Sequence, residues 1–311
     1  MKTKFIFAFV FAALLASCSH DDVVDNPSNG KTPLNISLAS VSATTRGAYD
    51  AGGVLTEGSI GVFTTGTGYT SANMKYNYGT PSWAPQDEAN TVYLSNEIAT
   101  VFAYGPYDGA FNRAAAPLAA GEYAESKDLC TTTVTGFTNT NSAVSLTLNH
   151  AYSRISFVIN KDVSYTGTCK IENLAISGPA IYATATADFT TPTTVISGKT
   201  AGTVQYDPLI AGITFGTPVT KSFVMIPAAT SEFTGGTVLT FKVDGVNLTT
   251  TLPVALPSET VGAGINELAA GYNYTVNIRI KGTQLVINSV QVNPWTAVPV
   301  TGDVVPVATP V

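Results

Sequence analysis

Apolar and polar residues alternate along much of the chain, most regularly near its C-terminal end. Segment 272–281 separates into an apolar set and a polar set: Tyr272, Tyr274, Val276, Ile278 and Ile280 against Asn273, Thr275, Asn277, Arg279 and Lys281. A period of two with one apolar face is typical of an antiparallel strand whose other face meets solvent. Gly282-Thr283 predicts a turn, and a returning strand is predicted over 285–292. We expect Trp295, which follows it, to fill a core.

Similar strand patterns recur upstream. Short β-branched, aromatic or alternating runs predict strands at 59–63, 100–104, 144–148 and 155–159. Two further runs, 239–243 and 246–250, flank Asp244-Gly245, and this dipeptide between alternating strands is the strongest short-range signal for a β-hairpin. No apolar pattern of helical period and length follows the N-terminal leader. The sequence therefore predicts an all-β chain of the sandwich type.

The first 17 residues have the pattern of a secretory signal peptide rather than of a folded element. A basic start precedes an apolar run over 5–15, which is too short to cross a bilayer as a permanent helix. Leu15-Ala16-Ser17-Cys18 resembles a bacterial lipobox and predicts acylation of Cys18, the alternative being a plain signal peptide with an incidental cysteine. Asp21-Asp22 resembles the acidic tag that sends lipoproteins to the cell surface in some anaerobic Gram-negative bacteria.

Residues 18–46 are predicted to form a propeptide. Arg46 is the one basic residue between Lys31 and Lys75, so a protease specific for arginine has a single target there. Cleavage between Arg46 and Gly47 is the prediction, and an ordinary solvated loop arginine is the alternative.

Composition narrows the possible partners. The formal net charge is −6, and charged residues make up 12% of the chain against about a quarter in typical proteins. An acidic chain without a basic block lacks the charge needed to neutralise phosphates, so nucleic acid is not an expected partner. A body rich in threonine, alanine, valine and glycine favours a β-rich extracellular protein with a hydroxylated surface.

The cysteines give little support for a disulfide framework. Beyond Cys18 the chain has Cys130 and Cys169, and one possible pair does not make a framework even in an extracellular protein. We expect free or buried thiols, with a Cys130–Cys169 disulfide as the alternative.

Candidate catalytic chemistry is sparse. His150 is the one histidine after the leader, so a histidine triad or multi-histidine metal site would depend on it alone. We expect a structural histidine, hydrogen-bonded at a domain junction. The nucleophile-elbow, zinc-protease, phosphate-loop and Cys-x-x-Cys motifs do not occur. Scattered carboxylates leave a secreted hydrolase as a third possibility, but no pair stands out. The prediction is a protein that is not an enzyme, with no cofactor and no metal site.

Several motifs occur in an order that resembles the fimbrillins, the pilin subunits of type V pili from gut and oral anaerobes. After the lipobox and the propeptide ending in Thr44-Thr45-Arg46 come Gly58-Ser59-Ile60-Gly61-Val62-Phe63, Phe102-Ala103-Tyr104-Gly105-Pro106-Tyr107, Leu146-Thr147-Leu148-Asn149-His150-Ala151-Tyr152-Ser153-Arg154-Ile155-Ser156-Phe157, Phe223-Val224-Met225-Ile226-Pro227 and the ending Gly271-Tyr272 to Trp295. Each motif is weak alone, and their order carries the resemblance over nearly the whole chain. The resemblance implies two tandem transthyretin-like antiparallel β-sandwich domains without catalytic activity. We expect these domains at 47–150 and 151–295.

The resemblance also implies assembly by donor-strand exchange. An alternating strand in the propeptide, with Leu34, Ile36 and Leu38 on one face, would leave after cleavage and expose a groove. The C-terminal tail 296–311 would fill the groove of a neighbouring subunit. Its candidate donor residues are Val304, Val305, Val307 and Val311. A disordered tail biased toward proline and valine is the alternative.

The sequence thus favours a structural subunit of a type V pilus that supports adhesion. Implied partners are other pilin subunits in a homopolymer or mixed pilus, an arginine-specific processing protease, the outer membrane through the lipid before cleavage, and a host or bacterial surface ligand. The expected location is the cell surface, first as an outer membrane lipoprotein precursor and then in the extracellular pilus. The alternative is a non-polymerising surface lipoprotein or tip adhesin that binds host glycan or protein.

Overall fold

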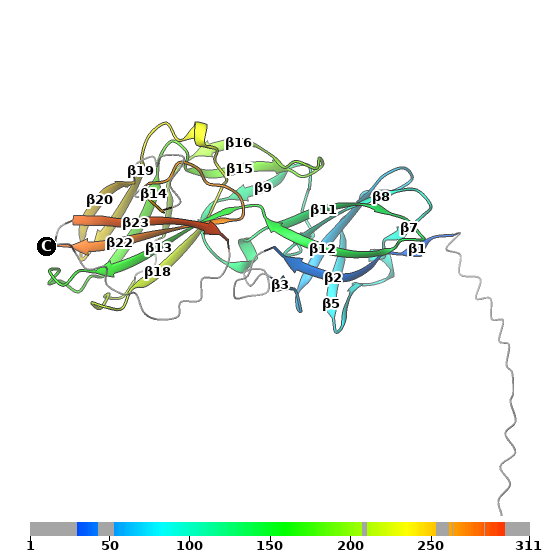
Figure 1. The fold of residues 1–311 in the computed structure, drawn as a ribbon, viewed down its shortest axis with the longest axis horizontal. Coiled ribbons are helices and arrows are strands. Elements are labelled where there is room, and N and C mark those ends of the chain that lie inside the picture. Colours follow the sequence, from blue (N-terminus) through cyan, green and yellow to red (C-terminus); the bar gives the residue numbers. More distant parts are fainter. Residues whose placement is uncertain are drawn as a thin grey trace, which may run out of the picture.

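The computed structural model describes residues 30–42, 53–206, 210–252, 261–262, 264–282 and 284–295. These residues form an elongated molecule of two β-rich domains placed end to end (Figure 1). Within the described residues, no helix combines the length and hydropathy needed to cross a membrane. The helices described are three short 3-10 turns: η1 (Glu88–Asn90), η2 (Glu125–Lys127) and η3 (Thr230–Glu232).

The first domain is built on an eight-stranded sheet in the order β3-β2-β12-β11-β8-β4-β5-β6, beside a separate β1-β7 pair. Its strands are β1 (Thr32–Pro33), β2 (Asn35–Val41), β3 (Gly53–Val54), β4 (Ser59–Thr65), β5 (Met74–Gly79), β6 (Ser82–Pro85), β7 (Tyr93–Leu94), β8 (Ala99–Gly105), β11 (Cys130–Phe137) and β12 (Ala143–His150). The sheet bends at β11 and β12, which pair only at Cys130↔His150 and Thr131↔Asn149. The bend brings β2 into contact with β6, so that two layers enclose one core.

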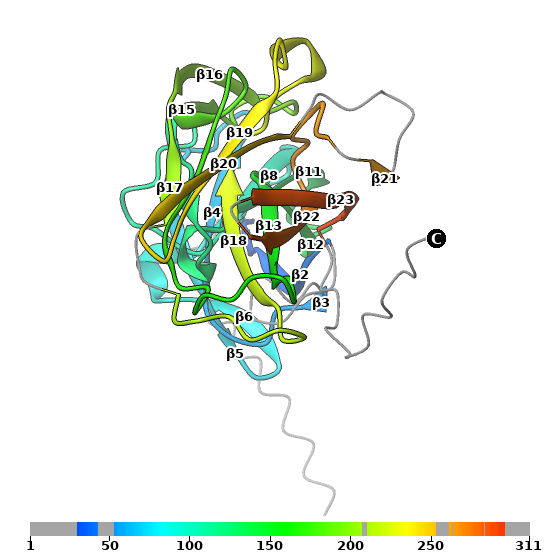
Figure 2. The same ribbon diagram turned by 90° about the vertical axis from the view of Figure 1, so that its left-hand side faces the viewer.

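The second domain is a sandwich of a six-stranded and a four-stranded sheet, with a three-stranded sheet toward the junction. The strand orders are β10-β18-β13-β22-β23-β21, β17-β14-β19-β20 and β16-β15-β9. The strands that follow residue 150 are β13 (Ser153–Lys161), β14 (Ile171–Ser177), β15 (Tyr182–Asp188), β16 (Val195–Ala201), β17 (Val204–Tyr206), β18 (Val219–Met225), β19 (Thr237–Val243), β20 (Val246–Leu252), β21 (Val261–Gly262), β22 (Tyr272–Lys281) and β23 (Gln284–Pro294). Figure 2 looks down the long axis at this domain.

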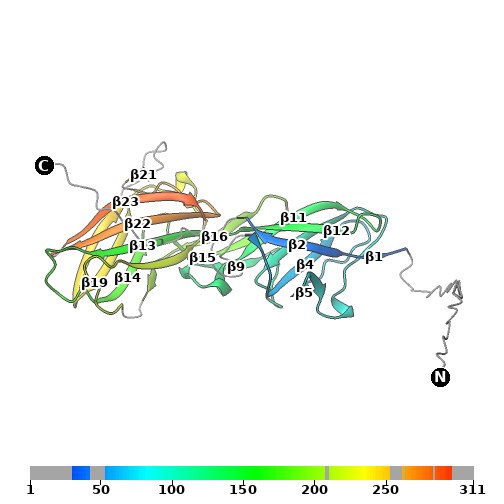
Figure 3. The same cartoon turned by 60° about the horizontal axis from the view of Figure 1, so that its bottom comes forward.

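Strand pairing crosses the boundary that we expected at residue 150. The strands β9 (Ala116–Ala119) and β10 (Gly121–Glu122) precede that residue, yet they pair with β15 and β18 of the second domain. The chain then returns to the first domain through β11. Figure 3 shows β9 beside β15 and β16 between the two lobes. The two domains are therefore joined by sheet hydrogen bonds as well as by the covalent crossing from β12 to β13.

In the part of the chain that the structure describes, three buried apolar clusters match this arrangement. One fills the first domain, one fills the second, and the third lies at the junction. In the second domain the fully buried Phe157 of β13 makes edge-on ring contacts with Phe223 of β18 and Phe241 of β19, so it packs across the sandwich. The junction cluster combines residues of both domains: Phe63, Phe102, Tyr104, Ala116, Leu118, Ala151, Tyr152, Ala185, Ala187, Phe189, Val224, Ile226 and Trp295.

One sequence motif has a direct packing explanation. Gly61 of β4 lies opposite Tyr104 of β8, and a Cβ at Gly61 would fall on the Tyr104 ring. The Tyr104 hydroxyl donates a hydrogen bond of 2.6 Å to the carbonyl of Asp108. Burial is the main reason that the pKa of Tyr104 rises to about 12, so the ring stays neutral. The glycine is required here because the aromatic ring takes the space of a side chain.

The predicted sandwich architecture is confirmed. The hairpin at Asp244-Gly245 joins β19 to β20, and both residues have the positive φ that this two-residue turn requires. Trp295 is fully buried as expected. Most pairs are antiparallel, but β2 pairs in parallel with β12 and β13 pairs in parallel with β22. The sequence patterns did not reveal these two pairings.

Candidate functional site

The first candidate site is the N-terminal strand β2, which completes the first domain. β2 lies between β12 and the two-residue strand β3, in the smaller layer of the bent sheet. Its ends are fixed by backbone hydrogen bonds, from Leu34 N to Val92 O and from Ser42 N to Leu148 O, both 2.8 Å. The layer that contains β2 covers one face of the domain core.

The side chains that β2 buries differ in part from the predicted set. Leu34 and Ile36 are buried, but Leu38 is 37% exposed while Ala39 and Val41 are buried. The cause is a bulge: Ile36 pairs with Val144 and Leu38 pairs with the next residue, Ser145, which leaves Ser37 as the extra residue. A bulge shifts the alternation by one position, so the prediction that Leu38 shares a face with Leu34 and Ile36 is wrong.

The connection from β2 to β3 contains the predicted cleavage site. β2 ends at Val41 and β3 begins at Gly53, which are paired with each other. Arg46 and Gly47 belong to the segment 43–52 between them and lie outside the described residues. The same holds for the signal peptide 1–17, for Cys18, and for the tail residues Val304, Val305, Val307 and Val311.

The second candidate site is a buried cluster at the bend of the first domain. His150, the last residue of β12, lies opposite Cys130, the first residue of β11. His150 Nδ1 is 2.9 Å from Asp128 Oδ1 and 3.3 Å from Cys130 Sγ. The imidazole stacks on the indole of Trp295, with 4.1 Å between ring centres and 5° between planes. This confirms the expectation of a hydrogen-bonded histidine at the junction; the Asp128 partner was not predicted.

Neighbouring groups hold this cluster between the domains. The Arg154 guanidinium lies over the rings of Tyr123 and Trp295, about 5 Å from each centre. The Tyr152 hydroxyl accepts a hydrogen bond of 3.1 Å from the Ala119 amide of β9. Burial is the largest cause of a raised pKa at Tyr152, and the nearby Asp128 carboxylate adds to it. Trp295, the last described residue, is thus fixed where the two domains meet.

A cleft of about 950 Å³ opens at the same junction. Residues of the first and second domains line it, including Ser42 at the end of β2, His150, and Pro294 at the end of β23. Its wall on β11 is rich in hydroxyl groups, contributed by Thr131, Thr132, Thr133 and Thr135. The end of β2 and the end of β23 therefore border one cleft.

The two cysteines of the body form no disulfide with each other. Cys130 is buried in the core of the first domain, whereas Cys169 is buried in the core of the second. Burial raises the pKa of the Cys169 thiol to about 11, which keeps it protonated and unreactive. The expectation of buried thiols is confirmed, and the alternative of a Cys130–Cys169 disulfide is wrong.

Sequence comparison places the chain in a family. The profile of the fimbrillin-like family matches residues 45–295. The chain belongs to the fimbrillin-like family. The matched region begins after β2 and ends at Trp295. The comparison with curated proteins found no match.

Solved structures share the fold of this fimbrillin-like protein. A Bacteroides uniformis protein proposed to act in cell adhesion has a TM-score of 0.60 at 21% identity, covering 87% of this chain and 100% of its own. A Bacteroides ovatus protein with the same proposed role has a TM-score of 0.64 at 17% identity, and the match covers 86% of this chain and 99% of its own. The tip fimbrial protein Mfa3 of Porphyromonas gingivalis was solved in a C-terminally truncated form. It has a TM-score of 0.51 at 9% identity, and the match covers 85% of this chain and 100% of its own. At these identities the likeness shows the fold alone.

Proposed function

We propose that this chain is a structural subunit of a type V pilus that supports adhesion. It is exported as a lipoprotein through Cys18, cleaved after Arg46, and polymerised by donor-strand exchange. Family membership supports a non-enzymatic pilus or adhesion role at the cell surface. The proposed lipidation rests on the lipobox resemblance of residues 15–18. The proposed cleavage and strand exchange rest on the placement of β2.

The observation that carries the proposal is that β2 is integral to the first domain yet precedes Arg46. A cut after Arg46 would leave β2 held by non-covalent contacts alone. Leu34, Ile36 and Val41 are buried, and at about 1.5–3 kcal/mol each they stabilise the domain by roughly 5–9 kcal/mol before entropy costs. Loss of β2 would expose the β12 edge beside vacated apolar pockets, and such an edge is a template for another strand.

The bulge in β2 narrows the register of the donor strand. The buried positions along β2 and the residue just before it are 34, 36, 39 and 41, with steps of two, three and two residues. The tail has the same steps at Val300, Gly302, Val305 and Val307, which would supply three valines. In this register Val305 and Val307 enter the groove of the neighbour, whereas Val304 faces outward.

The partners in this mechanism are other pilin subunits in a homopolymer or mixed pilus and an arginine-specific protease. The outer membrane holds the precursor through its lipid until cleavage. After assembly the subunit lies in an extracellular pilus, where a host or bacterial surface ligand is the adhesion partner.

The cleavage step is tested with Arg46→Ala and Arg46→Lys. An arginine-specific protease should convert the wild-type precursor into a body that begins at Gly47, as read by mass spectrometry. Both variants should keep the propeptide and stay monomeric. Trypsin should process Arg46→Lys and restore polymerisation, because it also cleaves after lysine. A wild-type body that still begins at Cys18 after exhaustive treatment would contradict the proposal.

The donor step is tested with matched tail variants. Val305→Asp and Val307→Asp should abolish oligomer ladders, because each buries an unpaired carboxylate in the groove of the neighbour. Val304→Asp, the control, should polymerise normally. Deletion of residues 296–311 should abolish ladders while the precursor keeps its stability within about 0.5 kcal/mol. Ladders from the deleted protein would exclude the tail as donor, and an unfolded monomer would assign it to its own core.

The junction cleft favours a second candidate function, that of a tip adhesin. A cleft lined by hydroxyl-bearing side chains can hydrogen-bond a polar surface ligand such as a glycan. Immunogold labelling of intact pili separates the two functions. Labels along the whole filament support the stalk subunit, and labels confined to filament ends support the tip adhesin.

A further inference from the structure

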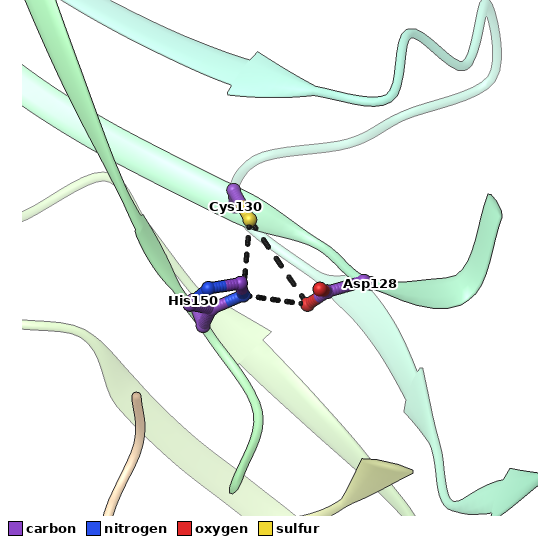
Figure 4. Close-up of side chains that lie close together, drawn as sticks. All are labelled: Asp128, Cys130 and His150. Carbon is purple, nitrogen blue, oxygen red and sulfur yellow. Dashed lines mark hydrogen bonds and ion pairs between the residues drawn. The ribbon is translucent and has the colours of Figure 1, made fainter. Parts of the chain in front are cut away.

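Three potential metal ligands of different chemistry meet at the bend of the first domain. Asp128 lies two residues before Cys130. His150 lies opposite Cys130 in the short ladder, two residues long, that pairs β11 with β12. One ligand atom from each residue lies within 4.8 Å of the others. Figure 4 shows that the three side chains, which come from two separate strand ends, point toward a common centre.

The distances between these atoms lie close to the edge lengths of a tetrahedral metal site, though they are not equal to them. Nδ1 of His150 is 2.9 Å from Asp128 Oδ1 and 3.3 Å from Cys130 Sγ, and Sγ is 4.0 Å from Oδ1. Tetrahedral zinc with bonds of about 2.0 Å to nitrogen and oxygen and 2.3 Å to sulfur gives edges of roughly 3.3–3.5 Å. Small side-chain rotations would bring all three atoms to these edge lengths.

The same nitrogen of His150 faces both of the other groups. In a purely hydrogen-bonded arrangement Nδ1–H donates to Asp128 Oδ1, and the Cys130 thiol donates to the same oxygen. The 3.3 Å contact between Nδ1 and Sγ is then not used as a hydrogen bond. An ion at the centre of the three atoms would use all of them. His150 also lines the junction cleft, which offers an ion a path from solvent to an otherwise buried cluster.

We propose that Asp128, Cys130 and His150 form a binding site for one zinc ion. The combination of thiolate, imidazole and carboxylate favours zinc over calcium or magnesium, which prefer all-oxygen sites. Water would occupy the fourth position. Zinc binding displaces the thiol proton of Cys130, so the affinity of the site for zinc rises with pH.

A metal ion bound at this site would stabilise the junction between the two domains. A bound ion would tie the start of β11 to the end of β12 where the two layers have little pairing, directly beneath Trp295. It would therefore fix the residue from which the C-terminal tail departs. This role is independent of whether the tail acts as a donor strand.

Cobalt provides the spectroscopic test on the purified full-length protein, kept reduced. One equivalent of Co²⁺ should produce a sulfur-to-cobalt charge-transfer band in the near ultraviolet. Zn²⁺ should displace the cobalt and raise the melting temperature. Cys130→Ser should lose the charge-transfer band, whereas Cys169→Ser, the control thiol, should keep it.

A second variant guards against misfolding of Cys130→Ser. Asp128→Asn removes the charge of one ligand while keeping its shape, and it should weaken cobalt binding at least tenfold while circular dichroism shows a folded protein. Two results would overturn the proposal. One is the absence of stoichiometric metal uptake and of any thermal shift in the wild type at millimolar metal. The other is a band that survives in Cys130→Ser and is lost in Cys169→Ser.

Discussion

β2 and β13 each pair in parallel with a later strand, but the two strands are held very differently. β13 pairs at seven positions with β18 on one side and at eight positions with β22 on the other. β2 pairs at six positions with β12 and at two with β3. The second domain therefore encloses β13 between two long ladders, whereas the first domain holds β2 mainly along β12.

This difference shows that a strand with buried side chains need not be permanently bound in its sheet. Ile36 of β2 and Phe157 of β13 are both 0% exposed, so side-chain burial alone does not distinguish the two strands. The distinction lies in the backbone, because departure of β2 breaks one long ladder and departure of β13 breaks two. A strand that is well buried yet bonded mainly on one side can be both stabilising and exchangeable.

The largest effects are expected from truncating the buried centre of each strand. Phe157→Ala should lower the free energy of unfolding of the precursor by about 3–5 kcal/mol, because Phe157 packs across the sandwich. Ile36→Ala should lower it by about 2 kcal/mol, at the low end for such changes, because the one-sided strand can relax. Urea denaturation measures both.

Amide hydrogen exchange shows which strands lose stability in each variant. Ile36→Ala should speed exchange of the β2 amides while the β13 amides keep their wild-type protection. Phe157→Ala should reduce protection throughout the second domain. Equal loss of protection in β2 and β13 for Ile36→Ala would mean that β2 does not open independently, and the comparison would fail.

Much of the second domain could be predicted from sequence because its local signals agree with its fold. The alternation over 272–281 matches β22, and Asp244-Gly245 forms the expected hairpin. The buried Trp295 and the junction histidine His150 follow from strand ends and from the scarcity of other histidines. In each case a short-range pattern is sufficient, since the neighbours in sequence are also neighbours in space.

Features that depend on distant contacts were not predictable. The Ser37 bulge exists because of the pairing between β2 and β12, whose sequences are about a hundred residues apart. No local sequence pattern indicates that β9 pairs with a strand of the second domain. Asp128 looks like any loop carboxylate in the sequence, and its burial beside His150 appears only when the sheet bends.

An intermediate effect is expected at a carboxylate that stabilises only the second domain. Asp244 accepts hydrogen bonds from the Tyr165 hydroxyl and from the amides of Cys169 and Lys170, at 2.8–2.9 Å. Desolvation opposes the charge of Asp244, but these bonds outweigh it and lower the pKa. Its stabilisation is therefore present above the unfolded pKa of about 3.9 and is lost as pH falls through the lower folded value.

The variant Asp244→Asn isolates this contribution. It should cost on the order of 1 kcal/mol at pH 7, as expected for hydrogen bonds to a charged group. The cost should shrink as pH falls below about 4, because the wild type then loses the same charge. Thermal unfolding of both proteins across this range provides the measurement. A cost that stays constant from pH 7 to the acid limit would show that the charge contributes nothing.

The smallest effect is expected at Leu38, and it tests the bulge that sets the register of β2. Because Leu38 is 37% exposed, Leu38→Ser should change the stability of the precursor by less than about 0.5 kcal/mol, the usual range for surface positions. The matched change Ile36→Ser, two residues earlier, should cost several times more, since it empties a core position and buries a hydroxyl. Urea midpoints of the two variants give the comparison directly. If β2 kept a regular alternation, Leu38 would face the core and the two variants would lose similar stability. That result would also remove the two-three-two spacing on which Val305 and Val307 are assigned to the groove and Val304 to the outside.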